Sequence, residues 1–369
     1  MEVVVPPLHH QVVTARLHVA EDAASLADAA AELELRLGRV ESLYEQTPAG
    51  LGVTLAWGLP YFARYVPGQA PVHLPFDRRA GKDALLDAIR FPSDPDELIL
   101  EANDVAVLLR SDRLDAVAEG ARVLFPEDDS IFAVTSIRKG FAGGGFAGGQ
   151  SLPKQMATAA GVPGAELIPD TAELFLGFTS TQRATLGPSR IANFETLGFV
   201  DVRDGYFGGG THMHLSHIFE DLEAWYLNFD FRERVDTTFH PGLDVRSGAQ
   251  TVAQREPVPT REVEAVFRRA GRIGHGAAIQ ATSRLEEDVI GPDETLYTRG
   301  TAVPQRADFN TLDNPFFWTS TPERDGMAEG AAAGVHFLTF NPSSDDFRRN
   351  RLAMDGVLPD GRRLELEPR

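Results

Sequence analysis

The alternation of strand-like and helix-like segments over the first 140 residues is the feature that most constrains the fold of this chain. Residues 11–20 are typical of a strand, and the Ala-, Leu- and Glu-rich residues 25–46 have the apolar spacing of an amphipathic helix. A second set follows, with an apolar strand at 104–111, helical spacing at 113–125 and a further strand at 131–140. Strands interleaved with helices in this way, with some strands adjacent, predict an α+β fold of the ferredoxin-like kind.

A glycine-rich stretch interrupts this pattern. The sequence GFAGGGFAGGQSLP at 140–153 is too rich in glycine for a regular element, and it indicates a linker or a loop pressed against another part of the protein. We therefore expect an N-terminal ferredoxin-like domain at 1–140, a connecting loop at 141–170 and a C-terminal ferredoxin-like domain at 171–369.

The second half repeats the mixed rhythm of strands and helices. Strand candidates lie at 172–178, 211–219, 275–281 and 334–340, and helical spacing recurs at 219–229 and 345–354. Asp345 and Asp346 are expected to cap the last helix, because acidic side chains favour a helix N-terminus. His9 and His10 precede the first strand, in a terminus that we expect to fray.

The composition limits the ligands and partners of the chain. It has no cysteine, which excludes disulfides, thiolate zinc sites, iron–sulfur clusters and haem held through cysteine. The formal net charge of −19, with no run of Lys or Arg, argues against nucleic acid and anionic membrane surfaces as partners. No stretch approaches the ~18 consecutive apolar residues of a membrane-spanning helix. The N-terminus has neither a basic region nor a long apolar run, so we expect a cytoplasmic protein, with export of a longer precursor left open.

Several segments of the chain resemble those of the dye-decolourising peroxidase superfamily, which are haem proteins built from two ferredoxin-like α+β units. The similar segments are ELFLGF at 173–178, GGTHMHLSHIFEDLEAWY at 209–226, GHGAAIQATSR at 274–284, LYTRGTAVP at 296–304, and GVHFLTF at 334–340 with the DDFRRNR that follows it. Each match is weak alone. Their shared order along the chain carries the resemblance, because independent weak matches rarely line up.

The resemblance implies haem b as the cofactor, held in the C-terminal half. His275 would be the axial ligand of the iron, and Arg299 would lie over the distal face, where a guanidinium can hold an anionic oxygen species and a haem propionate. Val335 and Phe337 match positions that wall the distal pocket. The implied activity is that of a peroxidase, an oxidoreductase that uses hydrogen peroxide to oxidise a small organic molecule. The oligomeric state stays open, a homo-oligomer included.

One position departs from the family. Its signature is GFxDGxxxP, whose aspartate is thought to move the peroxide proton, and the matching segment 145–153 has Gly148 in place of that aspartate. Gly148 would leave open volume beside the iron. A second alignment at 198–201 supplies an acid, Asp201, but loses the second glycine and the proline. If no acid takes this role, the resemblance implies a divergent haem enzyme, or a haem- or gas-binding protein without peroxidase activity.

Plainer interpretations stand beside these. His275 could be a structural histidine next to a glycine-rich turn, and Arg299 could be a surface residue in a turn. The histidines at 212, 214 and 217, with Glu220 or Asp221 nearby, offer an alternative: a non-haem protein that binds zinc or iron through this cluster.

Overall fold

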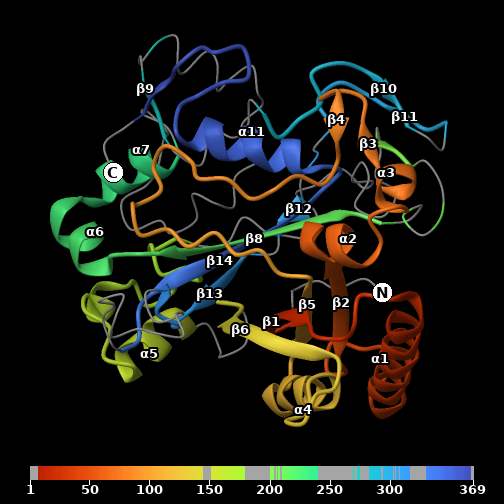
Figure 1. Cartoon of the computed structure of the whole chain (residues 1–369). Helices are drawn as coiled ribbons and strands as arrows, with labels where there is room; N and C mark the ends of the chain where they lie inside the picture. The colour runs from red at the N-terminus through yellow and green to blue at the C-terminus, as the bar shows by residue number, and fades with distance from the viewer. Residues whose placement is uncertain are drawn as a thin grey trace.

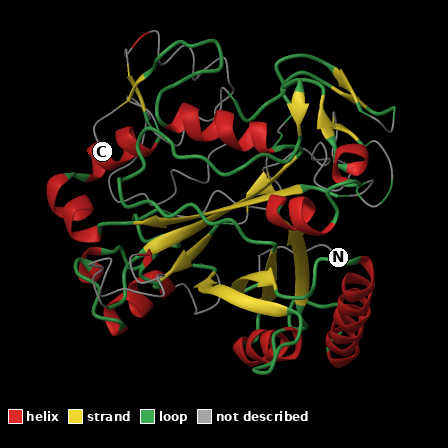
Figure 2. Ribbon diagram, in the orientation of Figure 1, coloured by secondary structure: helices red, strands yellow, loops and turns green. Residues whose placement is uncertain are grey.

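The computed structural model describes residues 7–143, 151–178, 200–202, 205, 207, 210–239, 269, 272–274, 282–291, 294–301, 303, 305–306, 308–315 and 330–366. These residues form a mixed α+β structure around one large sheet whose strand pairs are all antiparallel (Figures 1 and 2). The expected fold class is confirmed. Within the described ranges, no helix combines the length and the apolar character needed to cross a bilayer.

The first half of the chain is a ferredoxin-like unit. Its strands are β1 (His9–Leu17), β2 (Gly52–Trp57), β5 (Val105–Ser111) and β6 (Phe132–Phe141), in the spatial order β6-β1-β5-β2. Helices α1 (Ala23–Leu43) and α4 (Leu114–Leu124) connect β1 to β2 and β5 to β6. This order, with antiparallel neighbours throughout, is that of a β-α-β-β-α-β unit.

Helix α1 begins where the sequence supplies a cap. The Asp22 carboxylate accepts hydrogen bonds from the backbone N–H groups of Ala24 and Ser25, which have no partner within the first turn. The apolar face of the helix then packs on the core beside β1 and β5, through Leu26, Leu33, Leu37 and Val40. Spacing of this kind, which the sequence displays directly, is why the helix was predictable.

The second half continues the same sheet. Strand β14 (Gly334–Asn341) pairs on one side with β8 (His212–Phe219) and on the other with β13 (Phe309–Thr311) and β12 (Gln305–Arg306). Strand β13 also meets β6, where Asn310 faces Phe141, so one eight-stranded sheet runs through both halves. The expected domains therefore share a sheet, and their boundaries stay a prediction.

Helices flank the second half in two groups. Helix α11 (Ser344–Met354) crosses β8 and β14, whereas α5 (Leu152–Ala159), the short 3₁₀ helix η1 (Ala165–Leu167) and α6 (Leu222–Asn228) pack together near one end of β14, with α7 (Phe231–Thr238) following α6 (Figure 1). The remaining elements are α2 (Leu59–Tyr65), α3 (Ala70–His73), the small sheet β4 (Lys82–Asp83), β3 (Phe76–Asp77) and β7 (Val200–Asp201), and the pairs β10 (Val289–Ile290) with β11 (Leu296–Tyr297) and β9 (Arg272–Ile273) with β15 (Glu365–Leu366).

The sheet curls so that strands of the two halves share a buried interior. Val12 of β1 and Leu108 of β5 pack in one cluster with Leu338 and Phe340 of β14. His10, at the start of β1, points into this interior and is 2% exposed. The prediction that His9 and His10 belong to a frayed terminus is therefore wrong, because both pair in register with β5 and β6.

The segment 172–178 is a turn and not the expected strand. The backbone N–H groups of Glu173 and Leu174 both donate to the Phe178 carbonyl, and Gly177 has a φ of +90°. The reversal sends Phe175 into the cluster beneath α5 and α6 and Phe178 into the cluster beside α7. The apolar residues of this turn therefore pack into two different hydrophobic clusters. Glycine at 177 adopts the positive φ without the strain that a side chain would cause.

We predict that Gly140→Ala destabilises the protein by about 1–3 kcal/mol, because the added methyl group overpacks a filled site. A Cβ at Gly140 would lie 2.1 Å from Cε1 of His10 and 2.8 Å from the carbonyl oxygen of Asn310. Urea unfolding measures the change. The control is Gly38→Ala within α1, where a Cβ meets nothing within 4 Å and alanine should stabilise the helix by ~0.5–1 kcal/mol. Equal effects in the two variants would contradict the prediction.

Candidate functional site

The β8–β14 pair presents two faces with different side chains. In the register, Ile218 lies opposite Val335, and Ser216 lies opposite Phe337. Because side chains alternate along a strand, these residues share one face, which we call the pocket face. The other face carries His217 and its cross-strand neighbour His336. The two pocket-wall residues predicted from the sequence, Val335 and Phe337, therefore do lie on the same side of the sheet.

An aromatic layer closes one end of the pocket face. Phe347 of α11 lies between Phe337 and Phe91, with ring centroids 6.0 and 6.1 Å away. His214 stacks on the same ring at 3.4 Å. Phe91 comes from the segment between β4 and β5, so the first half of the chain supplies part of the cover over the second half. Arg351 lies 4.8 Å from the Phe91 ring and pairs with Asp94 at 2.9 Å, which fixes that segment to α11.

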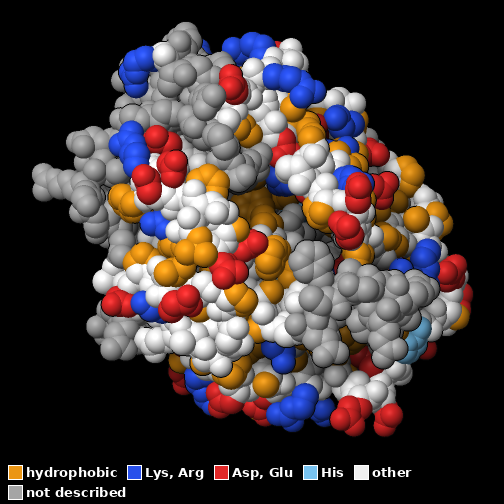
Figure 3. Space-filling view, turned by 90° about the vertical axis from the view of Figure 1, so that its left-hand side faces the viewer, with side chains coloured by type: hydrophobic (Ala, Val, Ile, Leu, Met, Phe, Trp, Pro, Cys, Tyr) orange, Lys and Arg blue, Asp and Glu red, His pale blue; other side chains and the backbone are white. Residues whose placement is uncertain are grey.

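The opposite end of the pocket face is less covered. Ile218 is 37% exposed, and Val335 is only partly buried, although both are apolar. Hydrophobic side chains gather around a hollow near the middle of the molecular face drawn in Figure 3. Ile218 and Val335 leave apolar surface uncovered at this end of the face.

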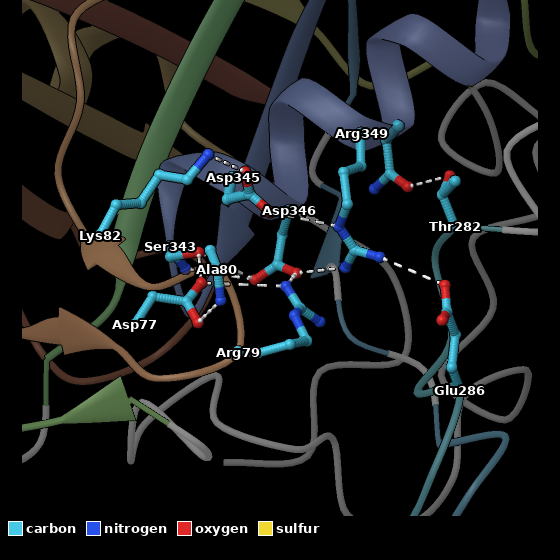
Figure 4. A network of polar contacts seen from close by, with 11 residues as sticks. Asp77, Arg79, Ala80, Lys82, Thr282, Glu286, Ser343, Asp345, Asp346 and Arg349 are labelled. Carbon is cyan, nitrogen blue, oxygen red and sulfur yellow. Dashed lines mark hydrogen bonds and ion pairs between the residues drawn. The ribbon is translucent and has the colours of Figure 1, made fainter. Parts of the chain in front are cut away.

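A buried polar network fixes the start of α11 (Figure 4). Asp346 accepts hydrogen bonds from Arg79 and, at 2.9 Å, from Arg349, and it forms a capping box with Ser343. The Ser343 hydroxyl donates to Asp77 at 2.5 Å. The β3–β4 hairpin is thereby joined to the helix that covers the pocket face. Asp346 helps to cap the helix as expected, but it does so with Ser343 as the N-cap residue.

We predict that Asp346→Ala destabilises the protein by about 3–5 kcal/mol, because the Arg79 and Arg349 guanidinium groups lose the buried carboxylate that they share and keep longer contacts, among them those to Asp77 at 3.9 Å and Asp345 at 3.4 Å. The free energy of unfolding in urea reports this loss. Glu286→Ala is the control, since Glu286 is exposed and lies 3.8 Å from the same Arg349. That variant should change stability by less than about 1 kcal/mol, and a comparable loss would contradict the role given to Asp346.

The three histidines of β8 do not converge. His212 and His214 lie on the pocket face, where the His212 Nε2 atom is 2.8 Å from the Ser344 hydroxyl, whereas His217 points into the sheet interior. Among the described residues, no three His, Asp or Glu side chains are arranged to hold a metal ion. The proposed non-haem site of His212, His214 and His217 is therefore wrong, because an odd spacing from 214 to 217 places imidazoles on opposite faces.

His217 belongs instead to a buried cluster of imidazoles. Nε2 of His10 lies 2.9 Å from Nδ1 of His336, and the His217 ring meets the His336 ring edge-on at 4.7 Å. The His10 ring also packs on Phe309 at 3.8 Å. The cluster joins β1 of the first half to β8 and β14 of the second.

Burial keeps these imidazoles neutral. It lowers the pKa of His10 to about 3, helped by the positive charge of Arg110. Burial, followed by the charge of Arg138, lowers the pKa of His217 to about 4. Burial also holds the pKa of His336 well below its usual value of 6.5. Protonation of this buried cluster would place positive charges between the two halves, so the cluster stabilises the folded protein at neutral pH and not in acid.

We predict that stability falls as the pH drops below about 6.5. In that range the unfolded chain binds protons at these histidines while the folded protein does not. The lowered pKa values therefore favour unfolding until the pH reaches the folded-state values, about 4 for His217 and about 3 for His10. Each group contributes about 1.4 kcal/mol per pH unit. Urea unfolding at pH 7.5 and 5 should show a smaller loss in His217→Leu than in the wild type. Exposed His18→Gln is the control, and an unchanged loss in His217→Leu would refute the assignment.

Two other predicted site residues lie at the surface. Asp201 on β7 is 45% exposed at its side chain and pairs with Arg78 at 2.8 Å. Arg299 is exposed in the turn after β11, where its backbone N–H donates to Asp288 at 2.7 Å. Neither residue joins the Phe337 cluster. Their catalytic roles stay predictions.

The predicted iron ligand His275 and the glycine at the signature position, Gly148, lie outside the described residues. Gly274, the residue before His275, is described and buried. Its N–H donates to the Phe239 carbonyl at 3.0 Å, and a Cβ there would lie 2.5 Å from the carbonyl oxygens of Asp236 and Phe239. The chain therefore enters the His275 segment from a close contact with the end of α7.

The chemistry of the less covered end of the pocket face is compatible with haem. Haem is a flat, mainly apolar group, and Ile218 and Val335 offer an incompletely buried apolar surface of the matching kind. Neutral histidine is the ligand type that the cysteine-free chain can supply to iron.

Phe91 is a site residue that the sequence did not reveal. It lies in a loop far from the other pocket segments, and only the tertiary fold brings it to Phe337 and Phe347. Its neighbours in sequence, such as Pro92 and Ser93, carry no pattern that points to a pocket. In the sequence Glu220 was noticed only as a neighbour of the histidines, and its position directly after β8 gives it a different significance.

The chain matches one protein family by sequence. The model of a family of unknown function, DUF7405, matches residues 7–363. None of the curated protein sequences matches the chain.

Several solved structures that are similar to this chain are dye-decolourising peroxidases. A DyP-type peroxidase from Cellulomonas bogoriensis is 18% identical, with a TM-score of 0.58 over 95% of this chain and 85% of that one. DyPB from Rhodococcus jostii RHA1 is 15% identical, with a TM-score of 0.51 over 96% and 86%. A variant of that protein in complex with haem is 14% identical, with a TM-score of 0.50 over 96% and 86%. At these identities the likeness shows the fold alone.

Proposed function

Because the chain belongs to the DUF7405 family, whose function is unknown, and has the fold of the dye-decolourising peroxidases, we propose that it is a haem-dependent oxidoreductase with its pocket over the β8–β14 face. The observation that carries the proposal is the partly uncovered apolar surface formed by Ile218 and Val335, beside the aromatic layer around Phe337. The pocket of a haem protein needs such a surface to hold the macrocycle away from water.

Different side chains would hold the iron, attract the ligand and exclude water in this pocket. His275 would hold the iron through a neutral imidazole, and the packing of Gly274 on α7 would fix where its segment begins. Arg299 would attract an anionic ligand or a propionate, and Val335 and Phe337 would exclude water. When bound, haem supplies a redox-active iron that reacts with peroxide. The proposed reaction is the oxidation of a small organic molecule by hydrogen peroxide.

A second candidate function is haem or gas binding without peroxidase activity. Two observations favour it: Gly148 has no side chain to move a proton, and the reserve acid Asp201 is already paired with Arg78 at the surface. Removing a general acid or base typically costs about 10²–10⁴ in rate. The same pocket would then bind its ligand without promoting cleavage of a peroxide.

We predict that the purified protein, loaded with haem, shows an intense Soret absorption band that His275→Ala loses or shifts strongly, because the iron loses its protein ligand. Visible absorption spectroscopy measures the band. Exposed His18→Ala is the control and should keep the wild-type spectrum. A wild-type protein that takes up no haem would refute the proposal.

The same sample separates the two candidate functions. Rapid change of the spectrum on adding hydrogen peroxide, followed by oxidation of an added phenol or dye, supports the peroxidase. An unchanged spectrum in a protein that keeps its haem supports binding without peroxidase activity.

A further inference from the structure

Glu220 lies at the edge of the pocket face. It directly follows β8, and its backbone N–H donates to the Ala333 carbonyl at 2.9 Å, which extends the pairing of β8 with β14 by one residue. Alternation from Ser216 through Ile218 therefore places Glu220 on the same side of the sheet as Val335. The end of the face to which it belongs is the one that α11 leaves less covered.

Among the described residues, one oxygen of the Glu220 carboxyl group is buried without a partner. The residue as a whole is only partly buried, but its Oε2 atom is buried and has no hydrogen-bond partner among the described residues. Within the described part of the chain, no cation pairs with it. A buried, unpaired carboxylate would cost several kcal/mol, so the neutral acid is the stable form. Burial raises the pKa of Glu220 to about 8.

The charged and titratable side chains near Glu220 among the described residues do not pair with its carboxyl group. Glu220 lies close enough to Tyr226 of α6 that a charge on Glu220 would help to raise the pKa of Tyr226. The Tyr226 hydroxyl, however, donates its hydrogen bond to the Phe175 carbonyl at 2.7 Å. Arg234 of α7 lies over the Tyr226 ring at 4.6 Å and forms no ion pair with Glu220. The neighbouring acids Asp221 and Glu223 are exposed, and Asp221 caps α6. Within the part of the chain that the structure describes, the Oε2 atom of Glu220 therefore shares a proton with no fixed partner.

We propose that Glu220 is the proton-exchanging carboxyl group of the pocket over the β8–β14 face, in a role that Gly148 cannot fill. This inference rests on the proposed haem-binding function. The protonated carboxyl group donates its proton to a basic atom of a ligand in the pocket, so that its O–H bond breaks as the new bond to the ligand atom forms. The carboxylate that remains is disfavoured by burial and takes a proton back from water. No oxidant or further group is needed for this exchange.

The test compares Glu220→Gln, which keeps the shape of a neutral carboxyl group but cannot release its proton, with two other variants. Glu223→Gln removes an exposed acid from the first turn of α6, three residues after Glu220, and is the matched control. Glu220→Asp keeps a carboxyl group at the site. Circular dichroism checks that each variant folds.

Two measurements are made from pH 6 to 10 on the full chain. Without haem, the infrared band of protonated carboxyl groups should lose intensity near pH 8 in the wild type and Glu223→Gln, and this loss should be absent in Glu220→Gln. With haem, the visible spectrum should change over the same range in the wild type and Glu223→Gln but stay constant in Glu220→Gln. Glu220→Asp should retain a transition in both measurements, at a shifted pH.

The outcomes separate the two levels of the proposal. A haem-loaded Glu220→Gln protein that keeps the spectral transition would overturn the role of Glu220, even if the infrared change is lost, because the acid would then titrate away from the pocket. An infrared band that does not depend on residue 220 would overturn it too. A wild-type protein without a haem spectrum would instead refute the haem-binding function itself.

Discussion

The junction between β6 and β13 is the contact on which the rest of the structure depends. Among the described residues, a single residue pair, Asn310 with Phe141, joins the strands of the first half to those of the second. Side chains reinforce it: the Thr311 hydroxyl donates to the Lys139 carbonyl at 2.6 Å, and the Lys139 N–H donates to Asp313 at 2.5 Å. Because β13 also pairs with β14, this short junction sets the position of β14 and hence of the pocket face. The imidazole cluster lies on the opposite face and depends on the same geometry.

The sequence predicted the first half well because its signals are local. Helical spacing, the Asp22 cap and uninterrupted apolar strands are readable within ten to twenty residues, and the structure places β1, α1, β5, α4 and β6 within a few residues of the predicted segments. The predicted strand at 172–178 was wrong. The apolar alternation of this segment is typical of a strand, but its side chains pack into two separate hydrophobic clusters. A turn that feeds two clusters satisfies the same alternation, and only the glycine at 177 distinguishes it.

The candidate site was predictable in part. The alternation rule, applied strictly to β8, already separates His217 from His212 and His214, and it groups Val335 with Phe337. No rule of spacing could bring Phe91 to the aromatic layer, since its contacts depend on how the first half folds over α11. The burial of His10 was equally unpredictable, because its ring packs against Gly140 of a neighbouring strand, where a Cβ would lie 2.1 Å from it. His275 and Gly148, whose roles came from resemblance, remain predictions.

Burial keeps titratable groups neutral on both sides of β8. On the interior side, imidazoles lose their charge because desolvation opposes protonation; on the pocket side, Glu220 loses its charge because desolvation opposes ionisation. Opposite chemical groups thus reach the same neutral state through one cause. The consequences differ. The buried imidazole cluster destabilises the protein at acidic pH, whereas a neutral carboxyl group beside the proposed pocket can donate a proton to a ligand. The acidity of the chain as a whole, with its net charge of −19, does not dictate either state. What a carboxyl group can do here is set by the sheet face on which it lies, and β8 gives Glu220 the face that adjoins the pocket.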